Sequence, residues 1–141
     1  NKVKVKMKRN IFALIMLLST IGFSVEGQKK HQISICSLFK NESMYLKEWI
    51  EYHRMIGVDH FYLYNNDSED SSIHVLSPYI KMGIVTIVSW PSLIPDFLCE
   101  DLAHFAMSTQ IPAYENAARY RAYAETQWLC FLGVDEFIVP I

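Results

Sequence analysis

Short apolar runs alternate with longer segments of helical periodicity along most of this chain, and a polar cluster follows several of the runs. The apolar runs cover residues 33–39, 59–64, 84–90 and 128–132. They have the length and the β-branched and aromatic content of buried strands. Strands that alternate with helices are typical of βαβ units, so the sequence predicts an α/β fold with a mostly parallel sheet flanked by helices.

The first helix is expected over residues 41–55. Trp49 and His53 lie four residues apart and share an apolar stripe, which predicts that this side packs on the sheet and that His53 is a core histidine. Gly57 follows the last periodic residue and is expected to end the helix, since glycine readily adopts the left-handed conformation found there.

Two further helices are expected. A short one over residues 71–77 should be stopped by Pro78, because proline interrupts helical hydrogen bonding. Residues 91–108 carry two prolines and are interpreted as a long irregular connection. The last helix is expected over residues 111–125, with alanine and tyrosine side chains on its inner side.

The first 31 residues are expected to be a targeting segment outside the folded domain. A basic stretch precedes an apolar run over residues 11–23, and small residues follow it, which is the order of a signal peptide. The run is short for a membrane span, although an uncleaved signal anchor and a buried N-terminal helix are alternatives. The segment predicts export or membrane association, in the secretory pathway and Golgi lumen or in a bacterial envelope.

Composition excludes some classes of function. Hydrophobic residues make up 51% and charged residues 20% of the chain, as in packed globular proteins. The net charge is −2, and five of the 13 lysine and arginine residues lie in the first nine positions, so the remainder is acidic and offers no basic face for nucleic acid. Cys36, Cys99 and Cys130 lack metal-like spacing and are expected to be buried thiols, a disulfide being the alternative.

Polar clusters follow three of the expected strands, over residues 40–42, 65–70 and 135–136. Because the carboxyl ends of parallel strands share one edge of a sheet, these clusters are expected to converge on one crevice. Carboxylates in that place suit a divalent cation and a nucleotide diphosphate. The alternatives are a helix N-cap at Asn41, an ordinary turn after residue 64 and a solvated hairpin corner at Asp135.

Five strings of the chain, in consistent order and spacing, occupy residues 40–53, 57–66, 76–83, 110–116 and 128–138. As a set they resemble glycosyltransferase family 92. The resemblance implies that residues 32–141 are the N-terminal part of a GT-A-type, Rossmann-like domain that is incomplete at its C-terminus. It also implies transfer of a hexose, typically galactose, from a UDP-sugar donor to a glycan acceptor, with assistance from Mn²⁺ or another divalent cation.

The resemblance further implies a set of donor-binding residues. Asn41 and Glu42 would face the uracil or the ribose, and Asn66 would help to hold the nucleoside. Gln110 and Asn116, on the helix before the acidic motif, would line the donor sugar and the diphosphate.

In the same comparison, Asp135 would be the second carboxylate of an Asp-x-Asp motif and would bind the metal between the phosphates. Gly133 stands where the first aspartate is expected, which should lower the affinity for the donor. No catalytic base can be assigned within these residues. A non-catalytic relic or carbohydrate- or nucleotide-binding module that keeps this half-fold is therefore the main alternative. A metal-dependent hydrolase is less supported, since such a site needs histidines or a second carboxylate.

Overall fold

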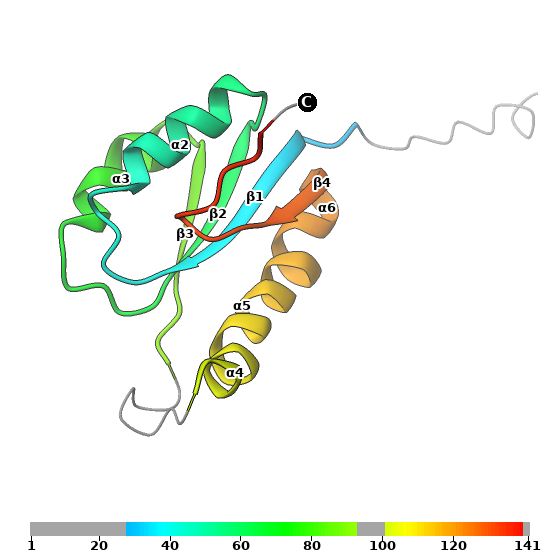
Figure 1. Cartoon of the computed structure of the whole chain (residues 1–141). Coiled ribbons are helices and arrows are strands. Elements are labelled where there is room, and N and C mark those ends of the chain that lie inside the picture. Colours follow the sequence, from blue (N-terminus) through cyan, green and yellow to red (C-terminus); the bar gives the residue numbers. More distant parts are fainter. Residues whose placement is uncertain (1–27, 93–100, 140–141) are drawn as a thin grey trace, which may run out of the picture.

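The computed structural model describes residues 28–92 and 101–139, which form one parallel sheet with helices on both faces (Figure 1). The predicted α/β fold and the parallel sheet are confirmed. Neighbouring strands pair in parallel in the order β3-β2-β1-β4. The strands are β1 (His31–Phe39), β2 (His60–Asn65), β3 (Val85–Ser89) and β4 (Thr126–Phe131).

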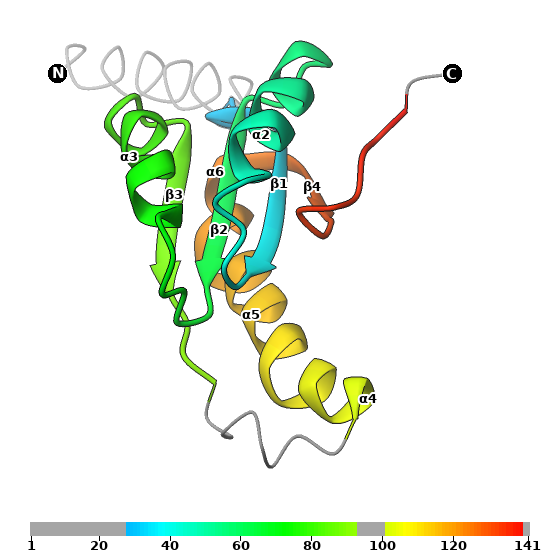
Figure 2. The same cartoon turned by 60° about the vertical axis from the view of Figure 1, so that its left-hand side comes forward.

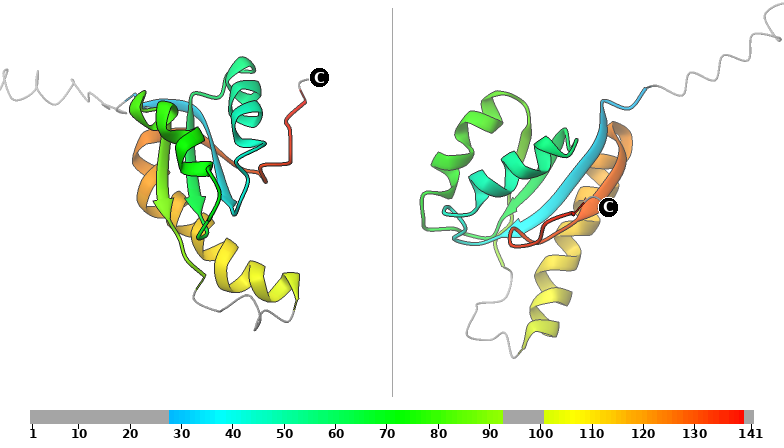
Figure 3. Two further views of the ribbon diagram at one scale, coloured as in Figure 1. Left: turned by 90° about the vertical axis from the view of Figure 1, so that its left-hand side faces the viewer. Right: turned by 45° about the horizontal axis from the view of Figure 1, so that its top comes forward.

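Two short helices cover one face of the sheet and a long helical segment covers the other (Figures 2 and 3). The short helices are α2 (Leu46–Met55) and α3 (Ser72–Lys81). The long segment joins α4 (Leu102–Phe105), η2 (Ala106–Gln110), α5 (Ile111–Asn116), η3 (Ala117–Ala122) and α6 (Tyr123–Glu125), of which η2 and η3 are π-helical. The chain adds β2 and β3 on one side of β1 and then crosses back to place β4 on the other side. Right-handed crossovers in the two directions put their helices on opposite faces, so the long segment lies on the face that α2 and α3 leave open.

Successive residues of the central strand β2 pack on opposite faces, as expected from the two-residue period of a strand. Phe61 and Leu63 lie in the core under α2 and α3, where the ring centroids of Trp49 and Phe61 are 5.5 Å apart. Tyr62 and Tyr64 lie in a second core under the long helix. That helix contributes small buried side chains, which let its backbone approach the strand: Ala113, Ala117 and Ala122.

The first helix is shorter than predicted, because it begins at Leu46 rather than at residue 41. Asn41 has a φ of +59°, which a continuous helix does not allow. The alternative that Asn41 is the helix N-cap was wrong as well, because Tyr45 is the residue before α2 and the Asn41 side-chain oxygen bonds the amide of Glu69. Trp49 and His53 are fully buried, which confirms the predicted apolar stripe and the core histidine. Gly57 follows the helix with a φ of +105°, as predicted.

The prediction that Pro78 ends the second helix was wrong, since α3 continues to Lys81. Proline removes the hydrogen bond to the carbonyl four residues earlier. Here both Pro78 and His74 lie on the exposed side of α3, where water can satisfy that carbonyl. Burial of Leu76 and Tyr79 against the sheet holds the helix across the proline.

The prediction of an irregular connection over residues 91–108 was wrong for its last part, because the long helix begins at Leu102. Asp101 caps it, with its side-chain oxygen accepting a hydrogen bond from the amide of His104 at 2.8 Å. Residues 93–100, which include Cys99, lie outside the described residues.

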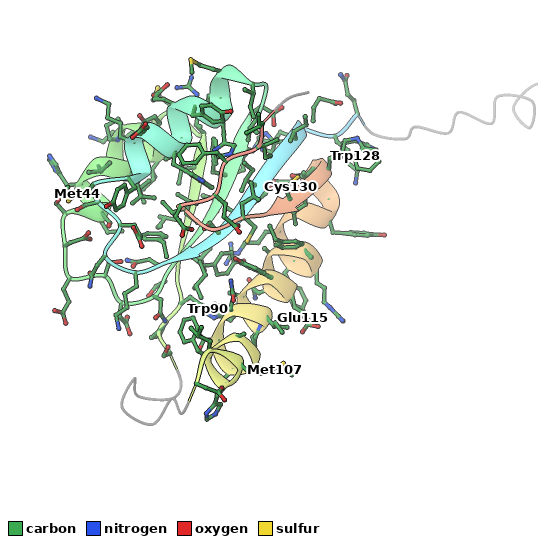
Figure 4. All side chains as sticks on the ribbon, in the orientation of Figure 1. Met44, Trp90, Met107, Glu115, Trp128 and Cys130 are labelled. Atoms are coloured by element: carbon green, nitrogen blue, oxygen red, sulfur yellow. The ribbon has the colours of Figure 1, made fainter. Side chains whose placement is uncertain are left out.

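The helix predicted over residues 111–125 is present, but its inner side differs from the prediction. The alanines are buried as expected, whereas Tyr120 and Tyr123 are 78% and 79% exposed. Tyr114 alone among these tyrosines packs against the inner cluster. Figure 4 labels Met107 and Glu115 on the long helical segment, and it shows Trp90 beside the first half of that segment. The Trp90 indole nitrogen donates to the carbonyl of Thr109 at 3.1 Å.

The cysteines within the described part carry free thiols. Cys36 is fully buried, as predicted, and burial raises the pKa of its thiol to about 12. Cys130 is half-buried on β4. Residues 1–27, and so nearly all of the predicted targeting segment, lie outside the described residues, and none of the described helices is long and apolar enough to cross a membrane.

Two stacked histidines occupy the amino-terminal edge of the sheet. His31 begins β1 and His60 begins β2, and their ring centroids are 4.1 Å apart. His60 Nε2 lies 2.9 Å from the hydroxyl of Thr86. Burial, with His31 and Lys30 close by, lowers the pKa of His60 to about 4. Burial lowers the pKa of His31 as well, so both rings are neutral in the folded protein near neutral pH.

The chain should therefore lose stability as the pH falls from about 6.5 toward about 4, because the unfolded chain binds these protons first. The substitution His60→Phe keeps a ring in the stack and removes the titrating group. It should make the dependence of the unfolding free energy on pH shallower, measured by urea unfolding at a series of pH values. His74→Gln, at an exposed histidine, is the matched control. Equal slopes for the parent and His60→Phe would contradict the prediction.

Candidate functional site

A pocket of about 530 Å³ lies at the carboxyl edge of the sheet, outside the ends of β1 and β4. These two strands flank the point where the strand order reverses, and in open α/β sheets such points are where ligands bind. The volume is in the range of small-molecule sites. Its polar lining comes from the ends of three strands and from the beginning of the long helix: Lys40, Glu42, Asn66, Asp101, Gln110 and Asp135.

The loop after β1 is tied to the loop after β2 by reciprocal hydrogen bonds. The amide of Asn41 donates to the hydroxyl of Ser68 at 2.9 Å. The side-chain oxygen of Asn41 accepts from the amide of Glu69 at 2.8 Å. The left-handed backbone of Asn41 makes both bonds available at once, since asparagine tolerates that conformation better than most residues. Glu42, the next residue, is thereby directed into the pocket.

Asp70 adds a second connection between the same two loops. Its carboxylate accepts from the amide of Ser43 at 2.8 Å and from the amide of Ser72 at 3.0 Å. The hydroxyl of Ser72 donates to it as well. Desolvation opposes ionisation, but these donors outweigh it and lower the pKa of Asp70 to about 2. The loop pair is therefore stabilised by an ionised carboxylate at all but strongly acidic pH.

Asn66 is buried where β2 ends. Its side-chain nitrogen donates to the carbonyl of Trp90 at 2.9 Å and lies 3.1 Å from the hydroxyl of Ser92. These contacts join the end of β2 to the segment after β3 and fix the orientation of the Asn66 side chain at the pocket wall. Asn116 lies farther along the helix, where its side-chain oxygen accepts from the hydroxyl of Tyr64 at 2.8 Å.

The acidic motif forms a turn directly after β4. The amide of Glu136 donates to the carbonyl of Gly133 at 3.1 Å, and the Glu136 carboxylate accepts from the amide of Gly133 at 2.7 Å. The amide of Leu132, just before the turn, donates to the carbonyl of Cys36 in β1 at 3.2 Å. Asp135 is exposed on this turn and borders the pocket. The alternative of a hairpin corner is wrong for the described residues, because no strand follows the turn.

Negative charge predominates in the pocket. Glu42, Asp101 and Asp135 line it together with the cation Lys40. Burial raises the pKa of Glu42, and the nearby charges of Asp135 and Asp70 raise it further. An anionic diphosphate would be repelled by such a lining unless a cation accompanied it.

The side chains at the pocket fit a divalent cation that takes most of its ligands from water and phosphate. Within the described ranges, no group of three histidine, cysteine or acidic side chains is arranged to hold a metal. A cation that keeps water ligands and takes oxygens from phosphates needs only one or two carboxylates. Asp135 supplies one, and the mutual repulsion around Glu42 would be relieved by a cation. The residues therefore fit a metal that arrives with a phosphate ligand.

The pocket brings together four of the six residues predicted for the site, and it adds residues that sequence reasoning missed. Glu42, Asn66, Gln110 and Asp135 line the pocket, whereas Asn41 and Asn116 do not and are engaged in the hydrogen bonds described above. The missed residues are Asp101, Leu102 and Phe105. Asp101 precedes a stretch that is compatible with a helix, and this was the signal in the sequence for the helix start. That helix start places the three residues at the pocket.

The same part of the chain matches a known family. A family model described as glycosyltransferase family 92 matches residues 29–141. The chain belongs to glycosyltransferase family 92. This confirms the resemblance inferred from the sequence strings.

Three plant members of family 92 show the extent of the similarity. A family 92 protein of Ricinus communis is 32% identical over 125 residues, which are 87% of this chain and 20% of the relative. A rice protein, from Oryza sativa subsp. japonica, is 30% identical over 79% of this chain and 17% of its own length. An Arabidopsis thaliana protein is 31% identical over 77% of this chain and 16% of its own length. The chain thus spans about a fifth or less of these family 92 relatives.

The hydrogen bonds of Asp70 between the two loops predict a loss of stability for the substitution Asp70→Asn. An asparagine keeps one acceptor oxygen but turns an amino group toward the amide of Ser43 or of Ser72, so the unfolding free energy should fall by about 1–2 kcal/mol. Urea unfolding near neutral pH measures this. Asp67→Asn makes the same chemical change at an exposed position with a φ of +50°, which asparagine tolerates, and should be nearly neutral. Equal effects of the two substitutions would contradict the role of Asp70.

Proposed function

We propose that a protein containing this chain transfers a hexose, galactose in the first instance, from a UDP-sugar to a hydroxyl group of a glycan. One observation carries the proposal: a single pocket at the strand-order reversal collects Glu42, Asn66, Gln110 and Asp135 from four separate segments. Membership of a glycosyltransferase family supports the reaction class, and the pocket supports the proposal of a donor site at this edge of the sheet.

The donor would lie across the carboxyl ends of the strands. Glu42 and Asn66 would contact the nucleoside, where a buried, oriented asparagine and a half-buried carboxylate can bind hydroxyl and amide groups. Gln110 would contact the donor sugar or the diphosphate from the helix side. Phe105 and Leu102 give that wall an apolar surface. Nucleotide and sugar would thereby be held in a fixed orientation relative to an incoming acceptor.

Asp135, with Glu42 nearby, would hold Mn²⁺ or another divalent cation together with the phosphate oxygens of the donor. When bound, the cation would offset the negative charge that develops on the departing diphosphate. The reaction forms a bond from an acceptor oxygen to the anomeric carbon and breaks the bond from that carbon to the diphosphate. None of the described residues is assigned as the base for the acceptor hydroxyl.

A second candidate function is nucleotide or carbohydrate binding without transfer. Gly133 favours it, because the family motif is expected to have a second carboxylate at that position. Without that carboxylate, the acidic turn contributes only Asp135 to the pocket lining. The Glu136 carboxylate does not line the pocket and bonds the amide of Gly133 within the turn. Such a protein would bind a UDP-sugar weakly and release it unchanged.

The transferase proposal predicts that Asp135→Asn abolishes sugar transfer in an active protein containing this chain. The asparagine preserves shape but removes the charge that would hold the cation, so the rate should fall by roughly a hundredfold or more. Release of UDP, measured across a Mn²⁺ titration, reports the loss. Glu48→Gln, at an exposed carboxylate on α2, is the control and should leave the rate unchanged. Undiminished transfer by Asp135→Asn would refute the metal role.

Gly133→Asp tests whether the acidic turn is the metal motif. A Cβ at Gly133 would meet the Asp135 side-chain oxygen at 2.6 Å, at the free end of a flexible side chain that can rotate away. With a cation present the two carboxylates can share it, so Mn²⁺-dependent binding of UDP should become tighter, as calorimetry would show. Gly133→Ala introduces the same Cβ without the charge and should not tighten binding. No gain with Gly133→Asp would refute the assignment of this turn to the metal motif.

A further inference from the structure

One face of α2 binds the main chain that leaves the acidic turn. The indole nitrogen of Trp49 donates to the carbonyl of Glu136 at 2.8 Å. The hydroxyl of Tyr52 donates to the carbonyl of Ile138 at 2.9 Å. The amide of Ile138 donates to Nε2 of His53 at 3.3 Å. Residues three and four apart share one side of a helix, so these three side chains form one surface, here called the α2 clamp.

The contacts of His53 determine its protonation form. Its Nδ1 lies 2.8 Å from the carbonyl of Trp49, so Nδ1 carries the hydrogen and donates it. Nε2 is then an unprotonated acceptor, as the amide of Ile138 requires. The His53 ring is fully buried and stacks on Phe137 with centroids 5.6 Å apart and planes 13° apart. Phe137 also meets Tyr52 edge to face at 5.1 Å.

The acidic turn is therefore anchored at both of its ends. Before the turn, the amide of Leu132 is bonded to β1, which continues the sheet by one residue. After the turn, α2 holds residues 136–138 by the three bonds of the clamp and by the stacked Phe137 ring. Asp135 itself lies on the exposed apex between these anchors. The position of its carboxylate relative to the pocket therefore depends on both.

We propose that Trp49, Tyr52 and His53 are positioning residues for the Asp135 carboxylate. They act on the site through the main chain of residues 136–138. This inference rests on the proposed function for the role of Asp135, but the hold of α2 on the turn does not. The three side chains of the α2 clamp bond carbonyl and amide groups of the main chain. The attachment of the turn to α2 therefore depends on these side chains more than on the side chains at positions 136 and 138.

The test uses Tyr52→Phe, which removes one donor and keeps the ring contact with Phe137, in a protein containing this chain. Hydrogen exchange of the amides at 133–138 should rise by roughly two- to tenfold, the effect of one lost hydrogen bond. The apparent affinity for Mn²⁺ in the presence of UDP should fall by a similar factor. Trp49→Phe, which removes a different donor to the same segment, should reproduce both effects.

Tyr79→Phe is the matched control. It makes the same chemical change on α3, where the hydroxyl donates at 2.7 Å to Glu51, a residue of α2 whose side chain bonds Tyr79 and Arg54 and not the acidic turn. It should leave exchange at 133–138 and the Mn²⁺ affinity as in the parent, even where it lowers the unfolding temperature. This comparison separates positioning from a general loss of stability.

Unchanged exchange at 133–138 in both clamp variants would overturn the inference, and so would faster exchange with unchanged Mn²⁺ affinity. If the parent and Asp135→Asn bind Mn²⁺ and UDP equally poorly, the proposed function fails rather than the clamp. The positioning role is then withdrawn, and the exchange data alone decide whether α2 holds the turn.

Discussion

The place of β1 in the sheet is the constraint on which the rest of the structure depends. β1 pairs in parallel with β2 on one side and with β4 on the other, and it therefore lies at the point where the strand order reverses. Helices cover both faces beside it, and the loops that leave β1 and β4 separate from each other. The opening between those loops is the pocket, so the site is a consequence of chain topology before any individual side chain is considered.

The strands and their direction could be predicted because the signal is local. Runs such as residues 33–39 and 84–90 have a strand's length and β-branched content, and helical periodicity between them requires parallel crossovers. The helix boundaries depended on non-local contacts. Pro78 is tolerated because Leu76 and Tyr79 pack beneath it, and residues 41–45 are kept out of α2 by bonds to a loop more than twenty residues away. Such contacts leave no periodicity in the sequence.

The residues of the candidate site also divide into those that could be predicted from the sequence and those that could not. Glu42, Asn66 and Asp135 follow strands, so their convergence was predictable from the sheet alone. Asp101 and Phe105 reach the pocket because the long helix begins earlier than its alanine-rich part indicates. The surplus of negative charge around Glu42 likewise depends on distances between loops, and an anionic ligand in this pocket would need an accompanying cation to offset it.

The two tied loops also have an evolutionary consequence. Asn41 and Ser68–Glu69 exchange bonds, and Asp70 joins Ser43 to Ser72, so each loop supplies groups that the other needs. Each of these cross-loop bonds joins a side-chain acceptor of Asn41, Ser68 or Asp70 to a main-chain amide of the other loop, so loss of the acceptor leaves that amide without its partner. Positions 41, 68 and 70 should therefore keep side chains with an acceptor oxygen wherever the two loops are packed in this way. Transplanting one loop into another protein should therefore require the acceptor side chains of the partner loop as well.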